Sequence, residues 1–304
     1  MTTHSALIYR GADEFFTRAA GFVREGRAHD ERVLVIAAPE KLKTLQAVVG
    51  DGSDITFLTA DRTYTPQARP IQVAMEYFDR QPGRRTRMVA EQDLSRRHDL
   101  EIAAYMRLEA SGNAVFRGRP LTLLCAYDAD TVSEQVLESC RQVHDGLLEG
   151  DRLVSNPAYV DPAAFLAASA AVVQPPASAS TLECQGLGDL PKGRWLVETE
   201  AARTGMARPA VEDLVLAVNE VVTNALRHGR TPARLAVYRE DAALVCHVHD
   251  SGPGIPDAFA GFFPPSTARL GGRGLWLARQ LCDSVEVVRD PSGCHVRLLM
   301  LPRQ

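Results

Sequence analysis

Excess positive charge, long hydrophobic runs and closely spaced metal ligands are all lacking in this sequence. Its 304 residues carry 34 lysines and arginines against 38 aspartates and glutamates, which gives a formal net charge of −4. This balance offers no basic surface to nucleic acid, so we expect no direct DNA or RNA binding. The longest nearly apolar stretch, AAFLAASAAVV at 163–173, is too short and too rich in alanine to span a bilayer. We therefore expect no membrane segment.

The six cysteines are scattered, and none belongs to a CxxC pair or to a cysteine–histidine spacing typical of a metal site. In a reducing compartment such thiols stay free and are mostly buried. The amino-terminal stretch MTTHSALIYRGADEFF has no basic segment followed by an apolar run, so it does not resemble a signal peptide. We expect a cytoplasmic protein with neither disulfides nor a structural metal.

The length suggests two domains, because single cores usually stop growing below this size. In the first half, short β-branched runs alternate with stretches that are long enough for crossover helices. The expected strands are 6–9, 32–38, 55–58, 86–91 and 121–127, and the expected helices include 13–25, 71–80 and 98–115. Near-continuous apolar strands indicate a sheet that is covered on both faces. These features predict a doubly wound parallel α/β domain over residues 1–160.

Ligands of doubly wound sheets bind at the carboxyl ends of the strands. Here those ends carry Arg10, Glu91, Tyr127 and Asp128. This mixture of aromatic and charged side chains predicts a site for a small signal molecule. An interpretation of the same residues as ordinary loop residues that bind no ligand fits nearly as well.

The composition changes to alanine, proline and serine over 161–180, where Pro175 and Pro176 resist regular structure. We place the interdomain linker there and a second domain at 181–304. Its expected elements are helices from about 191, over 210–228 and from about 275, strands over 234–240 and 243–250, and a terminal hairpin. This order predicts an α+β sandwich with helices against one face of a mixed sheet.

The long helix of the second domain carries a polar stripe beside its apolar face. At about 100° per residue, Glu220, Asn224 and His228 lie within one narrow arc, and valines and leucines occupy the adjoining arc. Groups so placed line a pocket more readily than they face bulk water. His228 ends the helix, where we expect a structural role.

Two further segments have the chemistry of a nucleotide site. Asp250 ends the apolar strand 243–250 and is followed by Gly252 and Gly254, so its carboxylate can accept a hydrogen bond from a purine amine at the floor of an apolar slot. Gly272 and Gly274 precede a helix whose free N–H groups and dipole favour phosphate. Each segment by itself also fits an ordinary turn.

The order of the three segments resembles the GHKL (HATPase) superfamily of ATP-binding domains found in gyrase, MutL and histidine kinases. Within it, NEVVTNALRHG, DSGPGI and GGRGLWLARQLCDSVEV are most similar to anti-sigma-factor serine kinases of the RsbW type. The resemblance implies binding of ATP and Mg²⁺, with Asn224 as the Mg²⁺ ligand and Asp250 on the adenine amine. It also implies that Gly252 and Gly254 shape the adenine pocket and that Gly272 and Gly274 hold the phosphates.

The same resemblance implies a reaction and its partners. Glu220, one turn before Asn224, would act as general base toward a serine or a water. The partners would be a sigma factor and an anti-sigma antagonist of the STAS type, and the relatives imply a homodimer. The lid between Ile255 and Gly271 is short and carries three prolines and two adjacent phenylalanines, which favours nucleotide binding over efficient phosphotransfer. A second interpretation is therefore a non-catalytic partner-switching protein with a vestigial nucleotide pocket.

The first 160 residues resemble the MEDS sensory domain, which occurs before anti-sigma and histidine-kinase-type modules. The resemblance rests on ALIYRGADEFFTRAAGFVREG, the strand end at Glu91, EASGN, LLCAYD and His144. Where the family usually has a His-Glu pair before its asparagine, this chain has Leu108 and Glu109. The implied fold is akin to that of P-loop (RecA-like) NTPases. However, YRGADEFF lacks the Lys-Ser/Thr of a Walker A motif and has two acids that would repel phosphate, so we expect no ATP hydrolysis in this domain.

A histidine kinase is a third interpretation, because His98 and Asp99 are similar to a phosphoacceptor pair. Phosphoacceptor histidines lie on dimerising helical hairpins. His98 instead precedes a crossover helix of the α/β domain, which disfavours this interpretation.

Overall fold

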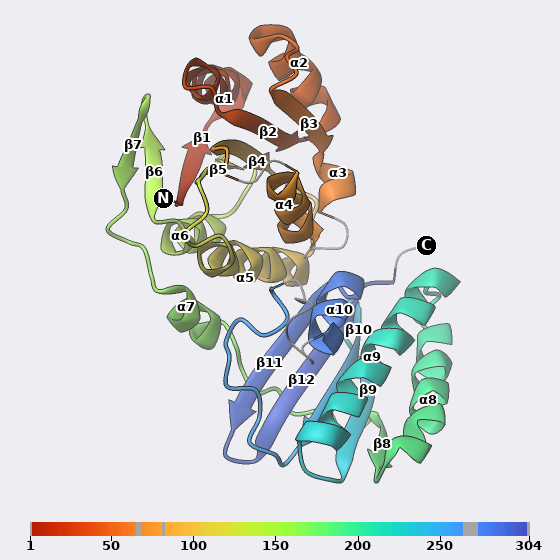
Figure 1. Cartoon of the computed structure of the whole chain (residues 1–304). Coiled ribbons are helices and arrows are strands. Elements are labelled where there is room, and N and C mark those ends of the chain that lie inside the picture. Colours follow the sequence, from red (N-terminus) through yellow and green to blue (C-terminus); the bar gives the residue numbers. More distant parts are fainter. Residues whose placement is uncertain (1, 65–68, 81–82, 264–272, 303–304) are drawn as a thin grey trace. The chain divides into compact units, whose positions relative to one another are not determined.

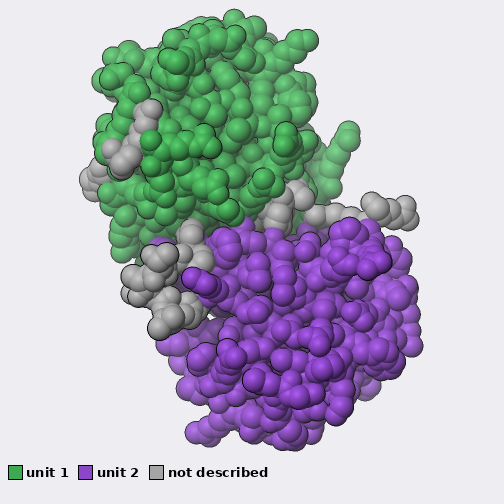
Figure 2. All heavy atoms as spheres, turned by 45° about the vertical axis from the view of Figure 1, so that its right-hand side comes forward, with its two compact units in different colours: residues 1–165 green, residues 166–304 purple. Residues whose placement is uncertain are grey.

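The computed structural model of the chain describes residues 2–64, 69–80, 83–263 and 273–302. The chain divides into two compact units (Figure 1 and Figure 2), unit 1 being residues 1–165 and unit 2 residues 166–304. The predicted linker 161–180 holds a short helix, α7 (Pro162–Ala168), and ends where the first strand of unit 2 begins.

Unit 1 is built on a seven-stranded sheet, counted over the described residues, in the order β3-β2-β4-β5-β1-β6-β7. The strands are β1 (Thr3–Tyr9), β2 (Arg32–Ala37), β3 (Ile55–Thr59), β4 (Thr86–Glu91), β5 (Leu121–Asp128), β6 (Gly146–Glu149) and β7 (Arg152–Ser155). All neighbours are parallel except β7, which forms an antiparallel hairpin with β6. The predicted parallel core is confirmed, and the sequence analysis missed the hairpin. The relation to P-loop NTPases stays a prediction.

Helices cover both faces of this sheet, as the near-continuous apolar strands predicted (Figure 1). They are α1 (Gly11–Ala28), α2 (Pro39–Val49), α3 (Ala60–Thr63), α4 (Arg69–Asp79), α5 (Asp99–Val115) and α6 (Glu134–Val143). On one face, Phe15 of α1 and Leu45 of α2 belong to the same buried cluster as Val35 of β2. On the other face, Leu108 of α5 lines a small cavity together with Leu123 of β5.

Unit 2 contains a five-stranded sheet, over the residues described, in the order β11-β12-β10-β9-β8. The strands are β8 (Ser180–Cys184), β9 (Ala233–Glu240), β10 (Ala243–Asp250), β11 (Ser284–Asp290) and β12 (Gly293–Met300). Each neighbouring pair is antiparallel, so the expectation of a mixed sheet is wrong. The sequence showed the terminal hairpin through its turn but not the direction in which β10 and β12 meet.

The helices of unit 2 lie against one face of its sheet, as predicted (Figure 1). They are the 3-10 turn η1 (Leu187–Asp189), α8 (Leu190–Ala202), α9 (Arg208–His228) and α10 (Arg273–Leu281). Val197 of α8, Leu214 of α9 and Ala278 of α10 share one buried cluster with Leu244 and Leu298 of the sheet. This core packs α9 and α10 side by side against the sheet, and the end of α9 lies near Asp250, whose Oδ1 accepts from the Arg230 backbone N–H.

All six cysteines are free and buried, which confirms the prediction made for the thiols. Among the residues described, the structure has no helix that is both long and apolar enough to cross a membrane.

Candidate functional site

The polar stripe of α9 lies where the helical period placed it. The adjoining apolar arc, including Leu214, Val218 and Val221, is buried, while Glu220 and Asn224 are half-buried. His228, the last residue of the helix, is exposed. Glu220 and Asn224 therefore stand at the border of the core, and His228 stands outside it.

The first turn of α10 packs directly onto this stripe through Gly274. A Cβ atom on this buried glycine would lie 2.8 Å from Asn224 Nδ2 and 2.9 Å from Glu220 Oε2. A side chain here would push the Asn224 amide and the Glu220 carboxylate aside, so the glycine lets both groups keep their positions beside α10. The structure thus brings Glu220, Asn224 and Gly274 together. Gly272 lies outside the described residues.

Asp250 is buried at the carboxyl end of β10, with 7% of its surface exposed. Its Oδ1 accepts hydrogen bonds from the backbone N–H groups of Gly252, at 2.8 Å, and Arg230, at 3.4 Å. Within the described parts of the chain, Oδ2 makes no hydrogen bond. Oδ1 therefore anchors the Asp250 side chain, and Oδ2 remains able to accept a hydrogen bond.

Glycine backbone surrounds the Asp250 carboxylate. A Cβ atom on Gly252 would lie 2.6 Å from Oδ1, and one on Gly229 would overlap the same oxygen. Gly254 has a φ of +73°, and a Cβ there would meet Arg289 Cδ at 2.8 Å. Gly252 and Gly229 thus shape the surroundings of this carboxylate, whereas Gly254 packs against the Arg289 side chain. The sequence analysis had treated Gly229 only as the residue after α9.

The residues predicted to bind a signal ligand in unit 1 do not share one pocket. Glu91 is buried and bonds to the Tyr9 hydroxyl and the Lys41 ammonium. Burial and the adjacent Glu91 carboxylate raise the pKa of Tyr9 above its usual value, so its hydroxyl stays a proton donor. Tyr127 is also buried, but it lies on the opposite face of the sheet, since Glu91 pairs with the preceding residue, Ala126.

The other two predicted sensory residues lie near each other at the ends of the paired strands β1 and β5. Arg10 is exposed and forms an ion pair with Asp130 at 2.8 Å. Asp128 accepts a hydrogen bond from the Asp130 backbone N–H at 3.1 Å. Both residues therefore take part in the turn that follows β5.

His98 caps the start of α5. Its Nδ1 accepts from the Leu100 backbone N–H at 3.3 Å, and its own backbone N–H donates to Glu101 at 3.0 Å. These two hydrogen bonds form a reciprocal capping box, which gives His98 a structural role at the start of a crossover helix. It agrees with the interpretation that His98 is not a phosphoacceptor.

A buried polar cluster in unit 1 was not predicted as a site. It consists of His4, Glu109, Cys125 and His144. Burial alone would raise the pKa of Glu109, but hydrogen bonds with His144 and His4 bring it well below its usual range. Burial raises the pKa of the Cys125 thiol and lowers that of His144. The four residues come from separate elements, so no local spacing in the sequence could have revealed them.

Comparisons with known proteins match each unit to a family. Residues 3–145 match the family described as MEDS, MEthanogen/methylotroph, DcmR Sensory domain. Residues 187–300 match the family described as histidine kinase-like ATPase domain.

Two individual proteins are similar over part of this chain. The signal transduction histidine-protein kinase AfsQ2 of Streptomyces coelicolor is 35% identical over 126 residues, covering 36% of this chain and 23% of that kinase. The crystal structure of the RsbU and RsbW domains of a Mycobacterium tuberculosis protein matches with a TM-score of 0.32 and 19% identity, over 43% of this chain and 34% of the other. The chain thus spans only about a quarter of the kinase and a third of the mycobacterial chain. Residues 3–145 form a MEDS sensory domain, and residues 187–300 form a histidine kinase-like ATPase domain.

Proposed function

We propose that this chain is a signalling regulator that binds ATP and Mg²⁺ in its C-terminal domain, under the control of its N-terminal sensory domain. Its partners in this proposal are a sigma factor and an anti-sigma antagonist of the STAS type. The family of residues 187–300 supports nucleotide binding, and the RsbW-like motifs NEVVTNALRHG and DSGPGI support the choice of partners.

The environment of Asp250 carries the nucleotide proposal. A buried carboxylate is costly unless it is hydrogen-bonded, and among the residues that the structure describes only Oδ1 is anchored, by the Gly252 N–H. Oδ2 has the chemistry to accept a hydrogen bond from the exocyclic amine of adenine. The glycine backbone at Gly229 and Gly252 lets a flat base come close, because no side chain stands in the way.

The phosphate end of the proposed site is the contact between α9 and α10. Asn224 would ligate Mg²⁺ through its amide oxygen, since Mg²⁺ prefers oxygen ligands and shares its shell with phosphates. Gly274, buried in the first turn of α10, would leave the nearby backbone open to a phosphate. The resemblance gives Gly272 the same role.

Glu220 is the proposed general base. It lies one turn before Asn224 and beside Gly274, so its carboxylate could take the proton of a serine hydroxyl that attacks the terminal phosphate of ATP. The competing proposal is a partner-switching protein that binds nucleotide without transferring phosphate. Transfer of labelled phosphate from ATP to a serine of the antagonist distinguishes the kinase proposal from the partner-switching proposal.

Calorimetric titration of the full chain with ATP and Mg²⁺ tests nucleotide binding. Asp250→Asn should weaken ATP binding by a factor of about 100 or more, because an amide nitrogen then faces the adenine amine. Asp189→Asn is the matched control, since Asp189 also accepts from a backbone N–H, that of Gln185 at 2.9 Å, but lies at the start of α8. Equal ATP affinity in the wild type and the Asp250 variant would contradict the proposed site.

Purification of the tagged full chain from its native cells, with ATP and Mg²⁺ present, tests the partners. We expect a sigma factor to be recovered and an added STAS-type antagonist to release it. Recovery of a response regulator, which takes its phosphoryl group from a phosphohistidine, in place of a sigma factor would favour a histidine-kinase pathway. It would overturn this part of the proposal.

A further inference from the structure

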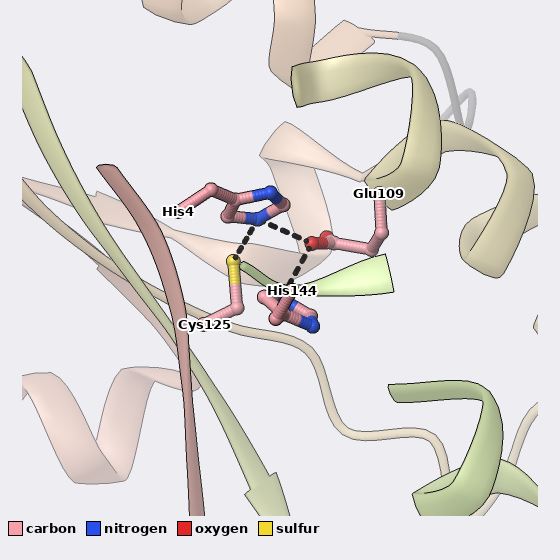
Figure 3. Close-up of side chains that lie close together, drawn as sticks. All are labelled: His4, Glu109, Cys125 and His144. Atoms are coloured by element: carbon pink, nitrogen blue, oxygen red, sulfur yellow. Dashed lines mark hydrogen bonds and ion pairs between the residues drawn. The ribbon is translucent and has the colours of Figure 1, made fainter. Parts of the chain in front are cut away.

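Four potential metal ligands converge in the interior of unit 1 (Figure 3). His4 lies on β1, Glu109 on α5 and Cys125 on β5, and His144 follows α6. One ligand atom from each side chain lies within 4.8 Å of all the others, and all four residues are buried. This cluster shares no residue with the proposed nucleotide site in unit 2.

Three separations between the ligand atoms are close to those expected around one small metal ion. His4 Nε2 lies 3.1 Å from Glu109 Oε2 and 3.3 Å from Cys125 Sγ, and His144 Nε2 lies 3.3 Å from the same Glu109 oxygen. Zinc bonds of about 2.0–2.3 Å place the ligand atoms of a tetrahedral site roughly 3.3–3.8 Å apart. Since all four ligand atoms lie within 4.8 Å of one another, movements of about 1 Å or less would let them surround one zinc ion.

The hydrogen bonds behind the rings fix both histidines with Nε2 facing the cluster. His144 Nδ1 donates to the Cys140 carbonyl at 2.7 Å. His4 Nδ1 lies 3.2 Å from Asn113 Oδ1, and the amide of Asn113 is oriented because its Nδ2 donates to the Val143 carbonyl at 2.7 Å. With a proton on each Nδ1, a neutral ring presents its Nε2 lone pair to Glu109. Such outer partners are typical of metal-ligating histidines.

Two lone pairs and a carboxylate oxygen facing one another repel unless a positive charge lies between them. A proton on one Nε2 would supply it as a single buried imidazolium, and protons on both would give two cations with centroids 4.3 Å apart in the interior. His144 Nε2 in fact makes no hydrogen bond of acceptable geometry, although it lies at ion-pair distance from Glu109. A metal ion satisfies all of these atoms at once.

We propose that His4, Glu109, Cys125 and His144 form a tetrahedral zinc site inside the sensory domain. The Cys125 thiolate and the Glu109 carboxylate balance the two charges of Zn²⁺, so the site is neutral overall, as a buried site requires. Cys125 loses its proton to solvent when zinc binds. Four protein ligands close the site, so zinc would tie β1, β5, α5 and the end of α6 together. This proposal departs from the sequence-based expectation of no structural metal.

Metal uptake by the metal-stripped full chain is the test. Titration with Zn²⁺ against a chromophoric chelator should show one tight site for each chain, and zinc should raise the melting temperature. Titration with Co²⁺ should give the intense visible bands of a tetrahedral ion together with a thiolate-to-cobalt charge-transfer band in the near ultraviolet. These spectra report the ligand set without relying on any activity of the protein.

Cys125→Ser should abolish the charge-transfer band and weaken zinc binding by a factor of about 100 or more. Cys140→Ser is the matched control, because this buried thiol lies beside the Nδ1 side of His144 and should keep both the band and the affinity. Asn113→Ala, which removes the hydrogen-bond partner of His4, should weaken zinc binding by about 10–100-fold and keep the band.

Three outcomes would overturn the zinc site. The first is a folded wild-type chain that takes up no zinc or cobalt. The second is a cobalt spectrum without a thiolate band. The third is a Cys125→Ser variant, folded by circular dichroism, whose zinc affinity equals that of the Cys140→Ser control.

Discussion

Gly274 and Asn224 lie so close that a Cβ atom on the glycine would stand 2.8 Å from the asparagine Nδ2. This contact joins the start of α10 to the middle of α9. Because α9 carries the proposed magnesium ligand and α10 the proposed phosphate-binding backbone, the spacing of the two helices sets the geometry of the site. A side chain at 274 should therefore harm binding more than folding.

Gly274→Ala should weaken ATP binding at least about 10-fold, because its methyl group displaces the side chains of Asn224 and Glu220. The fold should remain, since alanine favours a helix over glycine by about 1 kcal/mol. Calorimetry with ATP and thermal melting measure the two effects. Gly193→Ala in α8 is the control, because its nearest contact would be Leu235 Cδ2 at 3.7 Å. Unchanged ATP affinity in the Gly274 variant would contradict the account.

Glu220→Gln separates the kinase proposal from the partner-switching proposal. The glutamine keeps the size of the side chain but cannot accept the serine proton, so transfer of labelled phosphate to an antagonist should fall about 100-fold or more. ATP affinity should change little. Glu212→Gln, which removes a carboxylate paired with Arg208 on the exposed side of α9, is the control. No labelling even with the wild type would leave the partner-switching proposal in its place.

Glu31→Gln should destabilise unit 1 by about 3 kcal/mol at neutral pH, because it breaks a buried ion pair. Glu31 bonds to Arg87 Nε at 2.6 Å and to Arg85 Nε at 3.0 Å. Glu134→Gln, which breaks the exposed pair with Arg141, should cost less than about 1 kcal/mol. Urea unfolding of the three proteins at pH 7 gives both differences.

The effect of Glu31 should also depend on pH. Burial alone would raise the pKa of Glu31, but the bonds to Arg87 and Arg85 lower it below its usual value. A carboxyl group whose folded-state pKa is lowered stabilises the fold above its unfolded pKa of about 4.3, and this stabilisation is lost as the pH falls through the folded-state pKa. The difference between the wild type and Glu31→Gln should therefore shrink in acid. A constant difference between pH 7 and pH 3 would argue against the ion pairs.

Lys41→Met should destabilise the fold by about 3 kcal/mol, because it leaves the buried Glu91 carboxylate without its cation. Adding Glu91→Gln should recover a large part of this loss, since the double variant buries no unpaired charge. A double-mutant cycle in urea measures the coupling. Additive effects of the two substitutions would show that the pair does not act as a unit.

The elements that hold the proposed nucleotide site could be predicted because their signals are local. The period of α9 placed Glu220 beside the core, and the alternation along β10 put Asp250 at the end of a buried row. The contact between Gly274 and Asn224 could not be predicted, since it depends on how α9 and α10 pack. The direction in which β10 and β12 meet depends in the same way on tertiary structure, and the prediction of a mixed sheet was wrong.

The cluster of unit 1 shows the same limit more strongly. His4 and Cys125 lie on β1 and β5, strands that become neighbours only when the sheet forms. Glu109 and His144 were noticed only through the MEDS resemblance, in which Leu108 stands in place of the usual histidine. A cluster assembled from distant elements leaves no spacing in the sequence, so the lack of a metal-site spacing could not exclude the proposed zinc site.

The most direct test of the nucleotide site compares ATP with inosine triphosphate, which carries an oxygen in place of the adenine amine. If Asp250 Oδ2 accepts a hydrogen bond from that amine, the wild-type chain should bind ATP about 100-fold or more tightly than inosine triphosphate in the same Mg²⁺ buffer. Equal affinities for the two nucleotides, or binding of neither, would contradict the assignment of Asp250 as the residue that recognises adenine.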